Sequence, residues 1–140
     1  MKHHPIPYFT FEGTAREALE YYKEVFEGEI TDVQTFGEAN FETPPELDDH
    51  IMHARFKKDD LFFMVSDVFL NQNVTVGNNI SLALELDSAE EIESLYTRLK
   101  EKGTVYMELQ DTFWGATFAK VKDAYGVIWD LNFEKPGSSK

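Results

Sequence analysis

Apolar and polar residues follow one another along this chain in an order that occurs twice. In the second half, Leu82, Leu84 and Leu86 alternate with other residues, and this period of two predicts a half-buried strand over 81–86. Apolar residues then recur at the spacing of an amphipathic helix, at Ala89, Ile92, Leu95, Tyr96 and Leu99. Gly103 follows this run and is predicted to end the helix.

The first half has the same order of signals. An apolar stretch at 6–11 predicts a strand, and a helical pattern follows at Ala15, Ala18, Tyr22, Val25 and Phe26. Thr14 and Glu17 have the spacing of a capping box, as do Ser88 and Glu91 in the second half. Gly28 is expected to end the first helix in a left-handed conformation.

Three strand-like segments follow each helix, so that each half is predicted to be a βαβββ module. The segments are 29–36, 50–57 and 61–67 in the first half and 104–110, 116–122 and 127–133 in the second. The expected fold class is α+β, with two modules that form a cupped mixed sheet and helices on its outer face. A chain of 140 residues is expected to be one domain. Its predicted parts are module one at about 5–67 with a loop at 37–49, a connector at 68–79, module two at about 80–133 and a polar tail at 134–140.

The alternation of side chains in strands predicts which residues face away from the helices. If Leu82, Leu84 and Leu86 pack under the second helix, then Ser81, Ala83 and Glu85 face the concave side of the sheet. By the same rule, Ile128, Asp130 and Asn132 face that side if the residues between them pack under the helix. Aligning the two halves pairs Pro7 with Ser81, Phe9 with Ala83 and Met64 with Asp130. The alignment therefore predicts that Pro7, Met64, Ser81 and Asp130 converge on the concave face.

Composition and charge narrow the classes of partner. The formal net charge of −13 repels phosphate backbones and anionic lipids, so neither nucleic acid nor a membrane is an expected partner. The chain has no cysteine, which excludes disulfides, thiolate metal sites and cysteine nucleophiles. The first five residues lack the apolar segment of a secretory signal, so a cytoplasmic location is expected.

Several short segments resemble those of a known superfamily and occur in the same order along the chain. They are Pro7–Phe11, Gly13, Ala15, Glu17–Ala18, Tyr22, Met52–Ala54, Asp67, Phe113–Gly115 and Asp123–Trp129. On these residues the chain resembles the vicinal-oxygen-chelate superfamily of glyoxalase, bleomycin-resistance and dioxygenase proteins, and within it the PhnB-like branch. The resemblance covers essentially the whole chain. It implies paired βαβββ modules that form a cupped sheet, usually in a homodimer, with the modules paired either within one chain or between chains.

The same resemblance bears on metal binding and on methyl transfer. In metal-dependent members such as glyoxalase I, four ligands come from the first and last strands of the two modules, at positions that fall near Pro7, Met64, Ser81 and Asp130. Only Asp130 is a competent ligand for a hard metal, because proline has no donor group, methionine is soft and neutral serine binds weakly. No inherited metal site and no cofactor are therefore predicted. Some relatives have names that imply methylation of a ubiquinone precursor, but no glycine-rich nucleotide loop opens a helix here.

Polar residues within apolar strands are the candidates for a site. Asp130 lines a pocket as an acid or base, forms a salt bridge to Arg55 or Lys120, or stands at an edge position open to water. Glu85 either lines the pocket or stands at a strand end that is exposed to water. His53 is either a base or metal ligand, or a histidine that is hydrogen-bonded near the core. Trp114 is either a stacking wall for a flat ligand or a dimer contact. The predicted ligand-binding pocket consists of Phe9, His53, Met64, Ser81, Glu85, Trp114, Asp130 and Asn132.

Three functions are compatible with this pattern. The first is a metal-free protein that binds a small, partly apolar molecule in the cupped sheet, with Asp130 and Asn132 supplying polar contacts to a cationic ligand. The second is a lyase, isomerase or dioxygenase that depends on a divalent metal held at a relocated site by His53, Glu85 and Asp130. The third is a non-catalytic dimerisation module with a filled core. A homodimer and a small-molecule ligand are the expected partners in the first hypothesis, which we favour.

Overall fold

The computed structural model describes residues 1–39, 44–69 and 72–136. It divides the chain into two compact units, Met1–Thr75 and Val76–Lys140. Parts of the predicted loop at 37–49, the connector at 68–79 and the tail at 134–140 lie outside the described residues. Within the described residues, neither long helix has the length and apolarity that crossing a bilayer requires.

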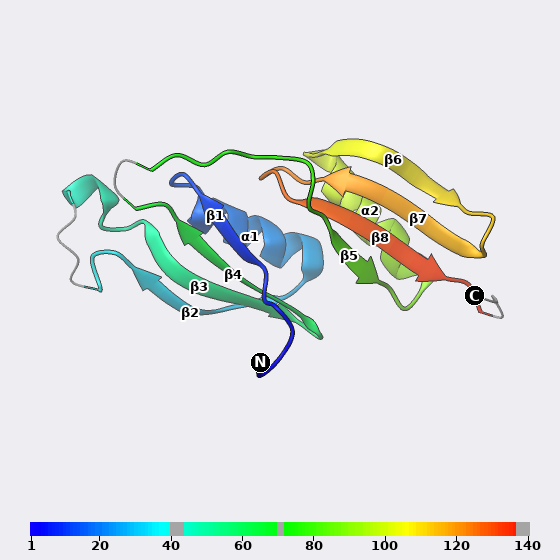
Figure 1. The fold of residues 1–140 in the computed structure, drawn as a ribbon, viewed down its shortest axis with the longest axis horizontal. Helices are drawn as coiled ribbons and strands as arrows, with labels where there is room; N and C mark the ends of the chain where they lie inside the picture. The colour runs from blue at the N-terminus through cyan, green and yellow to red at the C-terminus, as the bar shows by residue number, and fades with distance from the viewer. Residues whose placement is uncertain (40–43, 70–71, 137–140) are drawn as a thin grey trace. The chain divides into compact units, whose positions relative to one another are not determined.

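The N-terminal unit is a βαβββ module with a mixed sheet (Figure 1). Its elements are β1 (Tyr8–Phe11), α1 (Ala15–Phe26), β2 (Glu29–Thr35), the short 3₁₀ helix η1 (Pro45–Leu47), β3 (Ile51–Lys58) and β4 (Leu61–Asp67). The strand order is β1-β4-β3-β2, with β1 parallel to β4 and the other neighbours antiparallel. The helix packs on one face of this sheet, against β2, β3 and β4.

The C-terminal unit repeats this arrangement, which confirms the predicted α+β class and the two modules. Its elements are β5 (Leu82–Glu85), α2 (Ala89–Glu101), β6 (Thr104–Asp111), β7 (Ala116–Lys122) and β8 (Ile128–Glu134). The strand order is β5-β8-β7-β6, with β5 parallel to β8. Helix α2 packs on one face of this second sheet, against β6, β7 and β8.

Each unit buries its own apolar core between helix and sheet. In the N-terminal unit the core is aromatic: Tyr22 of α1 is fully buried and lies near the rings of Phe9, Phe56 and Phe63. In the C-terminal unit the largest buried side chain is that of Trp129. Burying a side chain of this size contributes about 1.5–3 kcal/mol or more to folding. Because each core lies between helix and sheet, the face of the sheet that points away from the helix is left for other roles.

The two capping boxes differ. Ser88 Oγ accepts a hydrogen bond from the Glu91 N–H, while Glu91 accepts one from the N–H of Asp87, so the prediction for α2 is confirmed in its main feature. The prediction for α1 is wrong, since the Thr14 side chain makes no capping bond. The buried carboxylate of Asp67 accepts the first helical N–H, that of Ala15, instead. A side chain from the end of β4 therefore caps α1.

The glycines after the helices act through close approach. Helix α1 ends at Glu27, which has the left-handed conformation (φ 55°) that was predicted for Gly28. A Cβ on Gly28 would lie 2.4 Å from the Phe56 ring, and one on Gly103 would lie 2.3 Å from the Lys122 carbonyl oxygen. Both positions therefore require glycine because the chain passes close to the sheet there, and the left-handed prediction for Gly28 is corrected.

The predicted concave position of Phe9 is also wrong. Phe9 is paired with Val65 and lies on the helix side, with its ring 4.7 Å from that of Phe63. Glu12 and Gly13 separate Phe11, the last residue of β1, from Thr14. In the second unit only Asp87 separates Leu86, which corresponds to Phe11, from Ser88. The first unit therefore has one residue more before its helix, and Gly13 there has φ 85°, a conformation that glycine adopts readily. Alignment by the capping boxes therefore shifted the first strand by one position, which reversed its faces.

Candidate functional site

The face of the second sheet that points away from α2 carries most of the predicted site residues. Lys120 on β7 is paired with Asp130 on β8, which is paired with Ala83 on β5. One row further along the same face, the paired residues are Phe118, Asn132 and Glu85. We call these six residues, together with Ser81 and Met107, the C-terminal open face. As predicted from the alternation, Ser81, Glu85, Asp130 and Asn132 lie together on it.

Asp130 is the centre of the C-terminal open face. Its Oδ2 accepts a hydrogen bond of 2.5 Å from the Ser81 hydroxyl. Its Oδ1 lies 3.6 Å from Lys120 Nζ, and this ion pair confirms Lys120 as one of the two predicted partners. Oδ1 is buried and has no hydrogen-bond partner among the described residues. Since buried carboxylate oxygens usually accept hydrogen bonds, this oxygen can still take a donor.

Polar and apolar side chains lie together on this face. Asn132 Nδ2 donates to Glu85 Oε2 over 2.8 Å, which ties β8 to the edge strand β5. Phe118 is paired with Asn132 on β7, one row from Asp130. Met107 lies on the other edge strand, β6, where it is paired with Lys120 and has 44% of its surface exposed. The face therefore combines a carboxylate with apolar side chains, as in sites that bind partly apolar molecules.

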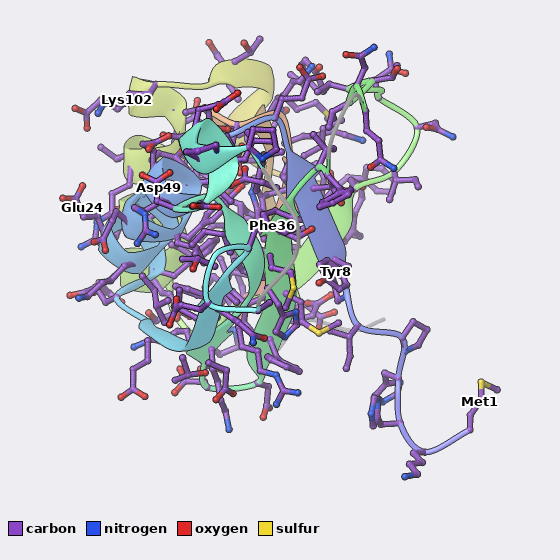
Figure 2. All side chains as sticks on the ribbon, turned by 90° about the vertical axis from the view of Figure 1, so that its left-hand side faces the viewer. Met1, Tyr8, Glu24, Phe36, Asp49 and Lys102 are labelled. Atoms are coloured by element: carbon purple, nitrogen blue, oxygen red, sulfur yellow. The ribbon has the colours of Figure 1, made fainter. Side chains whose placement is uncertain are left out.

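The corresponding face of the first sheet has different chemistry. We call Tyr8, Met64, His53, Arg55 and Phe62 the N-terminal open face, because they alternate with core residues on β1, β4 and β3. The Tyr8 hydroxyl and His53 Nδ1 are 2.9 Å apart, so the phenol reaches across β4 to β3. Figure 2 shows Tyr8 at the start of β1, where the N-terminal segment joins the sheet. His53 and Met64 therefore lie on this face, where Tyr8 takes the place predicted for Phe9.

Arg55 on the N-terminal open face is held by two neighbours. Its Nε lies 3.7 Å from Asp32 Oδ2, and its guanidinium carbon lies 6.0 Å from the centre of the Phe62 ring. Asp32 lies in a bulge of β2, at φ 54°, where β2 has one residue more than β3 between paired positions. The bulge aims an exposed carboxylate at Arg55.

The inherited metal positions do not fit a metal ion. Asp130 is the one hard ligand among them, and its two oxygens already face the Ser81 hydroxyl and the Lys120 ammonium. Within the described ranges, no three His, Asp or Glu side chains gather closely enough to hold a metal. His53 belongs to one unit, whereas Glu85 and Asp130 belong to the other. The relocated site of these three residues stays a prediction that elemental analysis of protein purified without chelator would test.

Trp114 lies away from the sheet face, in the turn between β6 and β7. Its ring is 52% exposed and meets the Phe113 ring edge-on at 5.0 Å, while Phe113 itself is 97% exposed. Beside this turn, Lys135 Nζ lies 3.0 Å from Asp111 Oδ1. The hydrogen bond from Lys135, then that from Thr117 and then the charge of Lys135 lower the pKa of Asp111 below its ordinary value.

Sequence reasoning did not select several residues of the two open faces, among them Tyr8, Arg55, Lys120, Phe118 and Met107. Arg55 and Lys120 appeared only as possible partners for Asp130. Each stands on an inner strand of its sheet, β3 or β7, at a position that alternates with core residues. A stricter use of the alternation on β3 and β7 would have placed both cations on the open faces. Tyr8 was missed because the first strand was aligned one position out of register.

Comparisons with known proteins agree with this geometry. The sequence model of the family described as 3-demethylubiquinone-9 3-methyltransferase matches residues 3–132. Protein YjdN of Escherichia coli is 29% identical over 139 residues, which cover 92% of this chain and 94% of that protein. The crystal structure of PA1353 from Pseudomonas aeruginosa is 34% identical, with a TM-score of 0.83 over 95% of this chain and 98% of that one.

Two further solved structures place the fold. The PhnB protein from Bacillus cereus is 28% identical, with a TM-score of 0.79 over 94% of this chain and 99% of that one. A glyoxylase/bleomycin resistance protein/dioxygenase domain from Frankia is 11% identical, with a TM-score of 0.71 over 98% of this chain and 95% of that one. At 11% identity, the similarity to the Frankia domain shows only that the two proteins share a fold.

Proposed function

We propose, from the premise that this chain belongs to the 3-demethylubiquinone-9 3-methyltransferase family and has the glyoxalase/bleomycin resistance/dioxygenase fold, that it binds a small, partly apolar organic cation. The ligand lies on the C-terminal open face, and Asp130 rather than a metal ion holds its charged group. Phe118 and Met107 contact its apolar part.

The observation that carries this proposal is the unsatisfied oxygen of Asp130. Ser81 occupies Oδ2 and orients the carboxylate, whereas Oδ1 accepts no hydrogen bond from the described residues. Lys120 is 3.6 Å away, and its side chain is 34% exposed, so it can turn towards solvent at little cost. A ligand ammonium that takes the place of Lys120 gains a charge-assisted hydrogen bond in a partly buried setting.

Methyl transfer, which the family's description names, is not part of the proposed function. Nucleotide-type cofactors are held by glycine-rich loops at helix N-termini. The segment that joins β1 to α1 is Glu12-Gly13-Thr14, which has one glycine and a carboxylate. The corresponding segment before α2 contains Asp87 and Ser88 and no glycine. Neither segment has the composition of such a glycine-rich loop.

A thermal-shift screen with paired probes tests the proposal. Benzylamine and benzyl alcohol share an apolar ring but differ in charge at neutral pH. We expect benzylamine-class amines to raise the melting temperature and the alcohols to leave it unchanged. A ligand at a hundred times its Kd stabilises a protein by about 2.7 kcal/mol, which such a screen detects readily. A screen in which no compound of any class stabilises the protein would contradict the proposal.

Two variants localise the effect. Asp130→Asn keeps an acceptor for Ser81 but removes the charge, and we expect it to abolish stabilisation by amines. Glu93→Gln removes the same charge from an exposed position on α2 and should bind amines like the unchanged protein. Equal stabilisation of both variants would place the amine elsewhere. Circular dichroism spectra of the variants establish that each is folded.

The exposed Phe113–Trp114 turn supports a further part of the proposal, that the chain forms a homodimer. Aromatic residues are enriched at protein interfaces, and 97% of the Phe113 surface is exposed. Light scattering on the unchanged protein should give the mass of two chains. Phe113→Ser combined with Trp114→Ser should give the mass of one, and a single-chain mass for the unchanged protein would contradict the proposal.

A further inference from the structure

We propose a second ligand site, in which the N-terminal open face binds the carboxylate of a small organic acid through Arg55 and His53. This site uses residues of the other unit and a ligand of opposite charge, so it does not depend on the cation site at Asp130. Three features of this face support the site: an imidazole held by a hydrogen bond, an arginine paired with a carboxylate, and apolar side chains beside both.

His53 is prepared to donate a hydrogen bond. Its one hydrogen bond within the described residues joins Nδ1 to the Tyr8 hydroxyl at 2.9 Å. When the phenol donates this bond, the neutral imidazole carries its proton on Nε2. In that tautomer Nε2 offers an N–H to a ligand oxygen. The edge-on packing of the two rings, with centroids 5.7 Å apart, restricts the imidazole further.

Arg55 already binds a carboxylate in this structure. Asp32 reaches it at 3.7 Å from the bulge of β2, and the two side chains are 50% and 64% exposed for Arg55 and Asp32. An ion pair that is this exposed contributes only about 0–1 kcal/mol. The Asp32 carboxylate is thus a weakly bound intramolecular partner of Arg55. A ligand carboxylate that contacts both Arg55 and His53 can replace it.

His53 and Arg55 stand two residues apart on the open face of β3. His53 and Arg55 are paired with Gln34 and Thr31 of β2 and alternate on the same face of β3. Same-face neighbours on a strand are about 6.4–6.8 Å apart at Cα, a span that a carboxylate bridges between two long side chains. Met64 lies beside Arg55 on β4, and the Phe62 ring lies 6.0 Å from the guanidinium. An aromatic or branched acid could place its apolar part over these residues.

Local charge is balanced here although the whole chain carries −13. Lys57 follows Arg55 on the same face of β3, and these two cations face Asp32 and Glu29 of β2. At physiological ionic strength charges are screened beyond about 8 Å, so the distant carboxylates of the chain oppose the binding of an anion only weakly.

Nuclear magnetic resonance titration of the full chain tests the site. Benzoate is the probe, benzamide its uncharged analogue and inorganic phosphate an anion without an apolar part. We expect benzoate to shift the His53 ring and Arg55 Nε resonances with saturation, and benzamide to shift neither. Arg55→Gln should weaken benzoate binding about tenfold or more, since it removes a charge-assisted hydrogen bond.

Further variants separate this site from general charge effects. Asp32→Asn should strengthen benzoate binding several-fold, because it removes the internal competitor. Lys23→Gln, an exposed substitution on α1, should leave binding unchanged. Shifts that benzamide reproduces, binding that survives Arg55→Gln, or weaker binding by Asp32→Asn would overturn the proposal. Phosphate that binds as tightly as benzoate would overturn the organic-acid assignment.

Discussion

At the scale of single residues, buried carboxylates hold the chain where elements meet. Asp67 accepts from the N–H of Ala15 and from that of Ile51, which joins the start of α1 to the start of β3. Asp123 accepts from the Tyr125 and Val127 N–H groups and from the indole of Trp129. Both are only 4% exposed. A carboxylate that accepts several N–H groups can be buried because these bonds replace those to water.

The sequence indicated these positions but not their roles. Asp67 and Asp123 both belong to the family resemblance, yet each acts as an acceptor for several N–H groups. Such roles depend on which backbone N–H groups lack partners after the strands have paired. Lys120 was one of two partners considered for Asp130, because a charge in an apolar strand needs a partner. The bond between Tyr8 and His53 was not foreseen, because it depends on the order of three strands.

The ion pair of Asp111 and Lys135 gives a prediction about pH. We expect Lys135→Gln to return the pKa of Asp111 towards its ordinary value, since it removes the principal hydrogen bond and the charge that lower it. Because the folded pKa is lowered, the pair stabilises the protein above the ordinary carboxyl pKa and loses this effect as pH falls through the lowered value. The carboxyl carbon shift, followed by NMR between about pH 2 and 5, measures this change.

Thr117→Val is the matched comparison for this prediction. It removes the second hydrogen bond to Asp111, of 3.0 Å, without changing the charge. Its effect on the pKa should be in the same direction and smaller. The assignment of the lowered pKa to Lys135 would be wrong if the two variants had equal effects. The Asp111 side chain is 68% exposed, so neither variant is expected to change the melting temperature measurably.

At the scale of elements, local patterns predicted the strands and helices, whereas the pairing between strands decided the faces. The alternation of Leu82, Leu84 and Leu86 was sufficient on β5, where the connection to the helix is short. On β1 the same reasoning failed by one position because of the added residue at Gly13. The bulges on β2 and β6 were also not predicted. Insertions of one residue change faces without changing the hydrophobic content, so a single sequence does not show them.

The difference between the two helix N-termini can be measured. Ser88→Ala should destabilise the protein by about 1 kcal/mol, because it removes the cap of the Glu91 N–H. Thr14→Ala should change stability by less than about 0.5 kcal/mol, as a substitution that removes no such bond. Urea unfolding followed by circular dichroism measures both. Equal losses would show that Thr14 caps α1 in solution, contrary to the contact with Asp67.

At the scale of the whole molecule, one architecture is used twice with different chemistry. Arg55 and Lys120 stand at corresponding places in the middle strands, paired with Met64 and Asp130 respectively. Lys120 has a carboxylate as its direct neighbour on the sheet, while Arg55 obtains one from the bulge of β2. The repeated fold thus fixes where a cation stands in each unit, and in our proposals the neighbouring residues decide which ligand charge each unit binds.

The net charge of −13 is a property of the whole chain and predicts how its stability depends on salt. Like charges repel more strongly in the compact state than in the unfolded chain. The screening length falls from about 30 Å at 0.01 M to about 8 Å at 0.15 M ionic strength. The melting temperature at pH 7 should therefore rise over this range of sodium chloride. Near the sequence pI of about 4.6 the net charge vanishes, and the salt dependence should shrink. A melting temperature that falls with salt at pH 7 would show instead that attractive pairs, such as those of Arg55 and Lys120, outweigh the repulsion.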